Sequence, residues 1–146
     1  MKRSEAKVKV GIKLTENMIY KCDLGQINMD DLFIDETRKK RTDRIGPSPT
    51  KLLALSILGC LAACFEFCLQ KKGFTLSDLD GRAEVTFTRK DKEFWRIRKI
   101  DIDLLPKIDN TEMRKSVAQC KNLFEQHCII SESLRKGIEI DVNLKY

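Results

Sequence analysis

The stretch Leu52 to Leu69, LLALSILGCLAACFEFCL, decides the fold of this chain. It carries a single charged side chain, that of Glu66, and is long enough to cross a lipid bilayer. A run at the short limit for a span, with a carboxylate near its C-terminal end, favours a helix buried in the core of a soluble protein. A chain of 146 residues buries so apolar a helix on every side most easily when a second subunit covers one face. We therefore expect a dimer that does not enter a membrane.

Both ends of this helix are marked in the sequence. Ser48 is a typical N-cap residue, and Pro49 suits the first helical position because its missing N–H is not needed there. Lys71 and Lys72 are followed by Gly73, which favours a C-terminal stop. These signals predict a helix from Pro49 to Gln70.

Short strands are predicted on the N-terminal side of the helix. Apolar and polar residues alternate from Val8 to Leu14, which predicts a strand. Two further extended segments are predicted at Met18 to Cys22 and at Gln26 to Ile34, separated by a turn at Asp23 to Gly25.

A hairpin is predicted after the long helix. Residues Ala83 to Thr88 alternate, a turn falls at Arg89 to Lys92, and Trp95 to Leu105 returns as the second strand. The alternation of the returning strand slips by one residue near Lys99, which predicts a bulge there.

The C-terminal third is expected to hold two helices and a strand. Pro106 ends the hairpin, and Asn110 or Thr111 caps a helix that runs to about His127. Two more elements follow in the prediction: a short helix that Ser131 caps and Gly137 stops, and a closing strand from Ile138 to Leu144. The element order predicts one α+β domain over residues 1–146.

Six cysteines are many for this length, but Met1 to Glu5 is polar and does not begin a signal peptide, so we expect a cytoplasmic protein with reduced thiols. Three of the cysteines, Cys60, Cys64 and Cys68, repeat every four residues and form one stripe on the helix. None belongs to a C-x-x-C pair, so we expect no metal and no cofactor. The remaining cysteines are Cys22, Cys120 and Cys128.

The formal charge of +6 raises the question of an anionic partner. The only dense basic cluster lies between Arg38 and Arg44 and has neither interleaved aromatic residues nor a known DNA-binding spacing. A solvated loop is the simpler interpretation, so we expect no nucleic-acid partner.

Three pieces of sequence together resemble the OsmC/Ohr family of thiol-dependent peroxide reductases. They are Gly46-Pro47-Ser48-Pro49-Thr50-Lys51-Leu52-Leu53, then Gly59-Cys60, and Cys128-Ile129-Ile130-Ser131 near the end. The resemblance implies an OsmC-like α+β fold, with antiparallel sheets around a long buried central helix. It also implies an intertwined homodimer with two active sites at the subunit interface.

The resemblance further implies that Cys60 and Cys128 are catalytic. Cys60 would attack an organic hydroperoxide as a thiolate, and Cys128 would resolve the sulfenic acid to a disulfide that an unknown dithiol reduces. Cys64 is an alternative to Cys60, because the Ala-Cys-Phe tripeptide of part of the family occurs here as Ala63-Cys64-Phe65. Distance from Pro49 favours Cys60.

The chain also differs from the family pattern. Peroxidatic members have a glutamate after the helix-starting proline, which holds an activating arginine, whereas this chain has Thr50. Cys-Pro is common at the second cysteine, whereas this chain has Cys128-Ile129. A non-catalytic dimer that binds a small apolar ligand at the subunit interface is therefore the alternative function. His127 is a candidate base for Cys128, and Glu66 is either a site residue or a solvated carboxylate.

Overall fold

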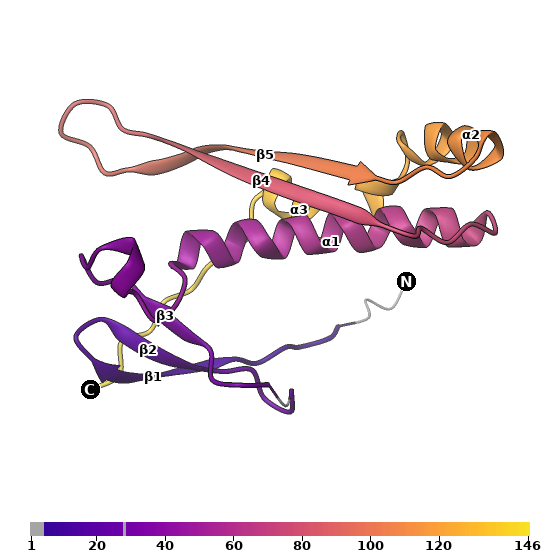
Figure 1. The fold of residues 1–146 in the computed structure, drawn as a ribbon. Coiled ribbons are helices and arrows are strands. Elements are labelled where there is room, and N and C mark those ends of the chain that lie inside the picture. Colours follow the sequence, from indigo (N-terminus) through magenta and orange to yellow (C-terminus); the bar gives the residue numbers. More distant parts are fainter. Residues whose placement is uncertain (1–4, 28) are drawn as a thin grey trace. The chain divides into compact units, whose positions relative to one another are not determined.

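The computed structural model describes residues 5–27 and 29–146, and Figure 1 shows the fold. The residues divide into two compact units, Met1–Leu52 and Leu53–Tyr146, which are described separately below. The long helix α1, Pro49–Lys71, begins in the first unit and continues into the second. Antiparallel sheets and one long helix confirm the predicted α+β class, whereas the predicted single domain over residues 1–146 stays a prediction.

The first unit contains an antiparallel sheet of three strands in the order β1-β2-β3. The strands are β1 (Gly11–Glu16), β2 (Ile19–Asp23) and β3 (Phe33–Asp35). The predicted strand from Val8 begins later than expected, since residues 8–10 have no strand partner. Asn28, which falls in a predicted extended segment, lies outside the described residues.

A buried carboxylate organises the loop after β3. Asp35 accepts hydrogen bonds from the hydroxyl and the backbone N–H of Thr37 and, at 3.0 Å, from the backbone N–H of Ile45. The hydroxyl of Thr37 does most to lower the pKa of Asp35, although burial opposes it. The basic residues between Arg38 and Arg44 are exposed on this loop, as the interpretation of a solvated loop predicts.

The backbone approaches itself closely at Gly46. A Cβ atom built on Gly46 would lie 1.9 Å from the carbonyl oxygen of Phe33, which no side chain can tolerate. Glycine is therefore required at this position for β3 to lie against the segment that leads into α1.

Both predicted ends of α1 are confirmed. At the start, the hydroxyl of Ser48 accepts a hydrogen bond of 3.4 Å from the N–H of Lys51. At the end, Gly73 has φ +83°, and the N–H of Phe74 donates to the carbonyl of Leu69 at 3.1 Å. With the bond from the N–H of Gly73 to Gln70, this is the Schellman motif that glycine favours.

Only one face of α1 is buried within the chain. Its buried side chains repeat every three or four residues and are Ala54, Ile57, Leu61, Phe65 and Leu69. Elsewhere on the helix, Leu55 is 62% exposed and Phe67 is 56% exposed. Burial on every side therefore does not occur within one copy of the chain. By length and composition α1 could also span a membrane, and the cytoplasmic location stays a prediction.

The second unit contains the predicted hairpin. Strands β4 (Leu79–Thr88) and β5 (Arg96–Pro106) pair antiparallel. Thr86 pairs with Lys99 whereas Phe87 pairs with Ile97, so Arg98 is the extra residue of a bulge. This confirms the bulge predicted near Lys99. Apolar side chains of β5 pack on the buried face of α1; they are Ile100, Ile102 and Leu104.

Three short helices follow, α2 (Thr111–Cys120), the 3₁₀ helix η2 (Phe124–His127) and α3 (Ile129–Lys136). Asn110 caps α2, as predicted, by accepting a 2.8 Å hydrogen bond from the N–H of Met113. The prediction of one helix to about His127 is wrong. After Cys120 the backbone bonds shorten to an i to i+3 pattern, as from Leu123 to Cys120, and the α-helix ends.

The last predicted elements are confirmed only in part. Helix α3 ends at Gly137, as predicted, but its N-cap residue is Cys128 rather than Ser131. The closing strand predicted from Ile138 to Leu144 is wrong, because residues 137–146 form no regular structure. Their alternating apolar side chains are exposed, with Val142 at 87%, and these residues pair with no strand of the described chain.

A disulfide joins α1 to α2, where the sequence had suggested only free thiols. Cys68, the third cysteine of the helical stripe, bonds to the buried Cys120. The two residues are 52 positions apart, and they lie where Phe65, Leu69 and Met113 form an apolar cluster. The expectation of reduced thiols is therefore wrong for Cys68 and Cys120.

We predict that Cys68→Ser lowers the free energy of unfolding. A loop of 52 residues corresponds to about 4 kcal/mol of lost chain entropy in the unfolded state. Urea unfolding without reductant should therefore show a loss of roughly 2–4 kcal/mol. With dithiothreitol, the wild type should unfold at the same urea midpoint as the variant. An unchanged wild-type midpoint in dithiothreitol would contradict the prediction.

We predict that Gly46→Ala destabilises the protein by roughly 2 kcal/mol or more, because the new methyl group meets the backbone of Phe33. Gly11→Ala is the control. An added Cβ at Gly11 would meet only the side chain of Asp23, at 3.7 Å or more, which is ordinary contact, so alanine should change stability by less than about 0.5 kcal/mol. Thermal melts compare the two, and equal effects would show that the close approach at Gly46 is not a constraint.

Candidate functional site

Three thiols meet in the second unit. Cys60 and Cys64 lie one turn apart on α1, and both pack against Cys128 at the start of α3. The structure thus brings together the two cysteines that the resemblance selects, Cys60 and Cys128, and it places the alternative, Cys64, beside them. All three are free thiols in this structure.

Helix packing places these side chains. Cys60 follows Ile57 by three residues, and Cys64 follows Leu61 by three, so both thiols lie beside the buried stripe of α1. Cys128 reaches the same cluster because η2 ends just before it and α3 begins just after it. Its side chain has no exposed surface, whereas Cys60 and Cys64 are half-buried.

Hydrogen bonds favour the thiolate form of Cys128. Burial opposes ionisation, but groups that can donate to a thiolate outweigh it and lower the pKa of Cys128: the Cys60 thiol, the nearby Ser131 hydroxyl, which makes no hydrogen bond in this structure, and the N–H groups of Ser131 and Ile130. One of these bonds, from the N–H of Ser131 to the sulfur, is 3.4 Å long. The N-cap position therefore stabilises a negative charge on this sulfur.

Cys64 has the opposite tendency. Burial raises the pKa of the Cys64 thiol, and the nearby sulfurs of Cys60 and Cys128 raise it further. Cys64 therefore stays protonated in this cluster and can act as a hydrogen-bond donor to the other two sulfurs.

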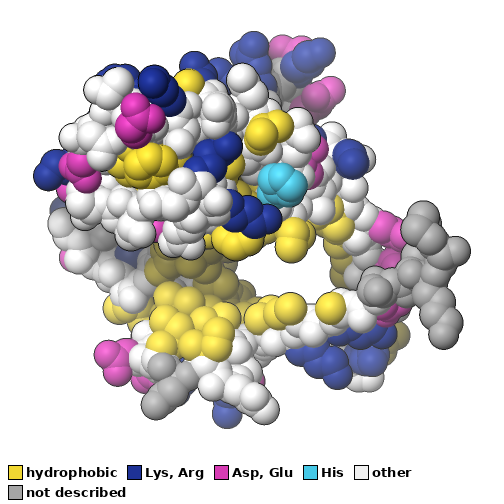
Figure 2. Space-filling model, turned by 90° about the vertical axis from the view of Figure 1, so that its right-hand side faces the viewer, with side chains coloured by type: hydrophobic (Ala, Val, Ile, Leu, Met, Phe, Trp, Pro, Cys, Tyr) yellow, Lys and Arg dark blue, Asp and Glu magenta, His cyan; other side chains and the backbone are white. Residues whose placement is uncertain are grey.

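An open pocket of about 910 Å³ adjoins the cluster. Cys60 and Cys64 form part of its wall, while Cys128 lies behind them. The other lining residues come from α1 and the segment around η2; they are Ala63, Glu66, Phe67, Cys68, Gln70, Lys71, Lys72, Leu123, His127 and Ile129. Figure 2 shows hydrophobic side chains gathered beside the chain's only histidine. A small molecule in this pocket reaches Cys60 before Cys128.

Polar groups line only part of the pocket. His127 and Glu66 are in its wall, and His127 is exposed although the next residue, Cys128, is buried. The Nζ atom of Lys71 lies 4.7 Å from the ring centre of Phe67, and that of Lys72 donates to Gln119 at 2.8 Å. His127 therefore presents its imidazole to solvent at the pocket wall.

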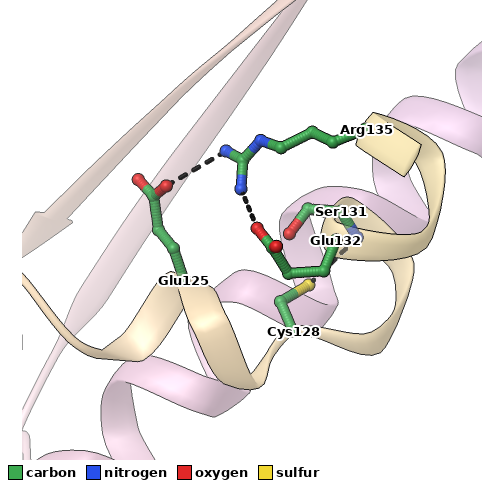
Figure 3. A network of polar contacts seen from close by, with 5 residues as sticks. All are labelled: Glu125, Cys128, Ser131, Glu132 and Arg135. Carbon is green, nitrogen blue, oxygen red and sulfur yellow. Dashed lines mark hydrogen bonds and ion pairs between the residues drawn. The ribbon is translucent and has the colours of Figure 1, made fainter.

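Figure 3 shows a polar network at α3 that the sequence did not predict. Arg135 pairs with Glu125 of η2 at 3.0 Å and with Glu132 of its own helix. All three side chains are at least partly exposed, so each pair contributes little to stability. Ser131 had been identified only as a cap. Its position three residues after Cys128 was the signal that could have indicated its role.

A family model described as OsmC-like protein matches residues 41–143. Among solved structures, an OsmC-like protein from Mycoplasma pneumoniae is 14% identical, with a TM-score of 0.73 over 90% of this chain and 89% of that chain. No curated protein matches the chain.

Two other similar structures carry descriptions that mention hydroperoxide. The organic hydroperoxide resistance protein OhrB of Bacillus subtilis is 16% identical, with a TM-score of 0.64 over 96% of this chain and 98% of that chain. An organic hydroperoxide resistance protein OsmC from Legionella pneumophila is 14% identical, with a TM-score of 0.56 over 91% and 92% of the two chains. At identities this low, the structural similarity establishes a shared fold and no more.

Proposed function

Because the chain belongs to the OsmC family, we propose that it is a thiol-dependent peroxide reductase that acts on organic hydroperoxides. The observation that carries this proposal is the contact of Cys60 with Cys128 beside an open pocket. Two structural relatives described as organic hydroperoxide resistance proteins support the same chemistry.

In the proposed reaction, Cys60 is the peroxidatic cysteine. Its sulfur attacks one peroxide oxygen, the O–O bond breaks, and an alcohol leaves while Cys60 becomes a sulfenic acid. The sulfur of Cys128 then attacks that of Cys60, water leaves, and a disulfide forms. An external dithiol restores both thiols.

The pocket favours an organic substrate over hydrogen peroxide. Its wall includes Phe67, Leu123 and Ile129, all of which are exposed apolar side chains. An apolar group attached to the peroxide would cover these surfaces and gain roughly 25 cal/mol for each Å² removed from water. Hydrogen peroxide has no such group.

We further infer that the working form is a homodimer in which a second copy covers the exposed face of α1. Leu55 is 62% exposed on a helix that is apolar nearly throughout. Exposed apolar surface on a long helix is typical of a face that a partner covers. Phe67, which lines the pocket, is a second exposed apolar side chain of the same helix.

An apolar pocket also supports the alternative function, a dimer that holds a small apolar ligand without turning it over. The sequence favours this alternative at one point, since Thr50 stands where peroxidatic relatives carry the glutamate that holds an arginine. Under this alternative, ligand would raise the melting temperature, and Cys60→Ser would bind as well as the wild type.

We predict that the purified protein consumes cumene hydroperoxide faster than hydrogen peroxide when dithiothreitol is present. Cys60→Ser and Cys128→Ser should each lose at least about 10²-fold, because each removes a sulfur of the proposed disulfide. Cys22→Ser is the control, since Cys22 lies on β2 outside the thiol cluster. If Cys64→Ser lost activity and Cys60→Ser did not, the peroxidatic cysteine would be Cys64. An inactive wild type would favour the ligand-binding alternative.

We predict that Leu55→Glu converts the dimer to a monomer, because a carboxylate would be buried without a partner in the interface. Sedimentation equilibrium measures the mass against 16.9 kDa for one copy. Phe94→Glu is the control, since Phe94 is 80% exposed in the turn of the hairpin and should leave the mass unchanged. A wild type that sediments as one copy at micromolar concentration would refute the dimer.

A further inference from the structure

Ser131 carries a feature that the peroxide chemistry described so far does not use. Its side chain is 7% exposed, and its hydroxyl has no hydrogen-bond partner among the described residues. A buried hydroxyl without a partner costs free energy, commonly about 1–3 kcal/mol, so it calls for an explanation. The hydroxyl lies beside the sulfur of Cys128, close enough to favour its ionised form.

An ionised Cys128 would give the unpartnered hydroxyl a hydrogen-bond acceptor. A neutral thiol is a weak hydrogen-bond acceptor, whereas a thiolate is a strong one. If Cys128 were ionised, the hydroxyl of Ser131 could donate to the same sulfur that already accepts from the N–H of Ser131. Four residues, Cys128 to Ser131, thus supply both the anion and its donors.

We propose that Ser131 and the N-terminus of α3 hold Cys128 as the resident thiolate of the site, and that this thiolate takes the proton of Cys60 as Cys60 attacks a peroxide. The proposal deepens the proposed function and rests on it for the second step. Cys60 packs against Cys128 in the apolar cluster, so the proton has only a short path between the two sulfurs. This arrangement would replace the activating arginine of peroxidatic relatives.

The proton and electron balance is complete. The sulfur of Cys60 bonds to one oxygen of the peroxide and loses two electrons, its proton moves to Cys128, and the O–O bond breaks. The departing alkoxide takes that proton and leaves as an alcohol, so Cys128 is again a thiolate. Cys128 then attacks the sulfenic acid of Cys60, and hydroxide leaves, taking a proton from solvent to become water.

The same thiolate governs reduction. Cys128 is buried, so an external dithiol reaches the sulfur of Cys60 at the pocket wall. Attack on Cys60 expels Cys128, and a sulfur with a low pKa leaves faster. The mixed disulfide therefore forms on Cys60, and the second thiol of the reductant releases it.

Groups around Cys128 from each packed element are compatible with a thiolate. Helix α1 contributes two thiols, Cys60 and Cys64, and β5 contributes the apolar side chains of Ile100, Ile102 and Leu104. The one nearby carboxylate on α3 is Glu132, whose charge is paired with Arg135, which also holds Glu125 of η2. His127 of η2 lines the pocket.

The test is a pH titration of thiolate absorbance at 240 nm, which needs no peroxide activity. The parent variant is C22S/C60S/C64S, prepared without reductant so that Cys68 and Cys120 stay joined and Cys128 is the only free thiol. Adding Ser131→Ala should move the titration to higher pH by about one unit or more, because one donor to a charged sulfur is lost. Ser133→Ala on the same helix is the matched control and should not move it.

Ser131→Thr keeps the hydroxyl and should titrate close to the parent variant. This variant distinguishes loss of the hydrogen-bond donor from loss of packing. Equal titrations for Ser131→Ala and Ser133→Ala would overturn the proposal. In the otherwise wild-type protein, Ser131→Ala should also shift the acid limb of the pH profile of cumene hydroperoxide consumption upward by a similar amount. A wild type without peroxide activity would overturn the proton transfer and the proposed function, while the titration would still decide the resident thiolate.

Discussion

Burial of one face of α1 is the constraint on which the second unit depends. Ile57 and Leu61 pack with the cluster that includes β5, and Phe65 and Leu69 pack with α2. Each of these side chains contributes roughly 2 kcal/mol when fully removed from water. Cys60 and Cys64 lie on the margin of the same stripe, so the packing that holds the fold also sets the position of the thiols. A change that rotated α1 would move both together.

Local signals explain what the sequence could predict of the fold. Ser48 and Gly73 each act through backbone bonds within a few residues, and the bulge at Arg98 follows from alternation along a single strand. Three features depend on geometry that the sequence does not state: the end of α2 at Cys120, its bond to Cys68, and the lack of a strand after Gly137. An alternating pattern shows that a segment can be a strand, but only a neighbouring edge makes it one.

For the candidate site, too, the sequence predicted some features, and others required the three-dimensional structure. The resemblance selected Cys60 and Cys128, but pairing across 68 positions of sequence requires the packing of α3 on α1. The prediction of a helix N-cap between Cys128 and Ser131 is confirmed, but the capping residue is Cys128 and not the predicted Ser131. Serine is the commoner N-cap, so propensity favoured Ser131. The backbone instead begins α3 at Ile129, which makes the sulfur the cap and leaves the hydroxyl free for a charge.

The bond between Cys68 and Cys120 closes a covalent ring around the whole β4–β5 hairpin. The turn at the tip of that hairpin is exposed and carries Arg89, Lys90 and Lys92, which trypsin recognises. A cut there opens the ring without releasing either strand, so the nicked chain keeps its mass on a denaturing gel until the disulfide is reduced. In an oxidising environment the two fragments would thus stay covalently joined, and in a reducing environment they would no longer be linked by a covalent bond.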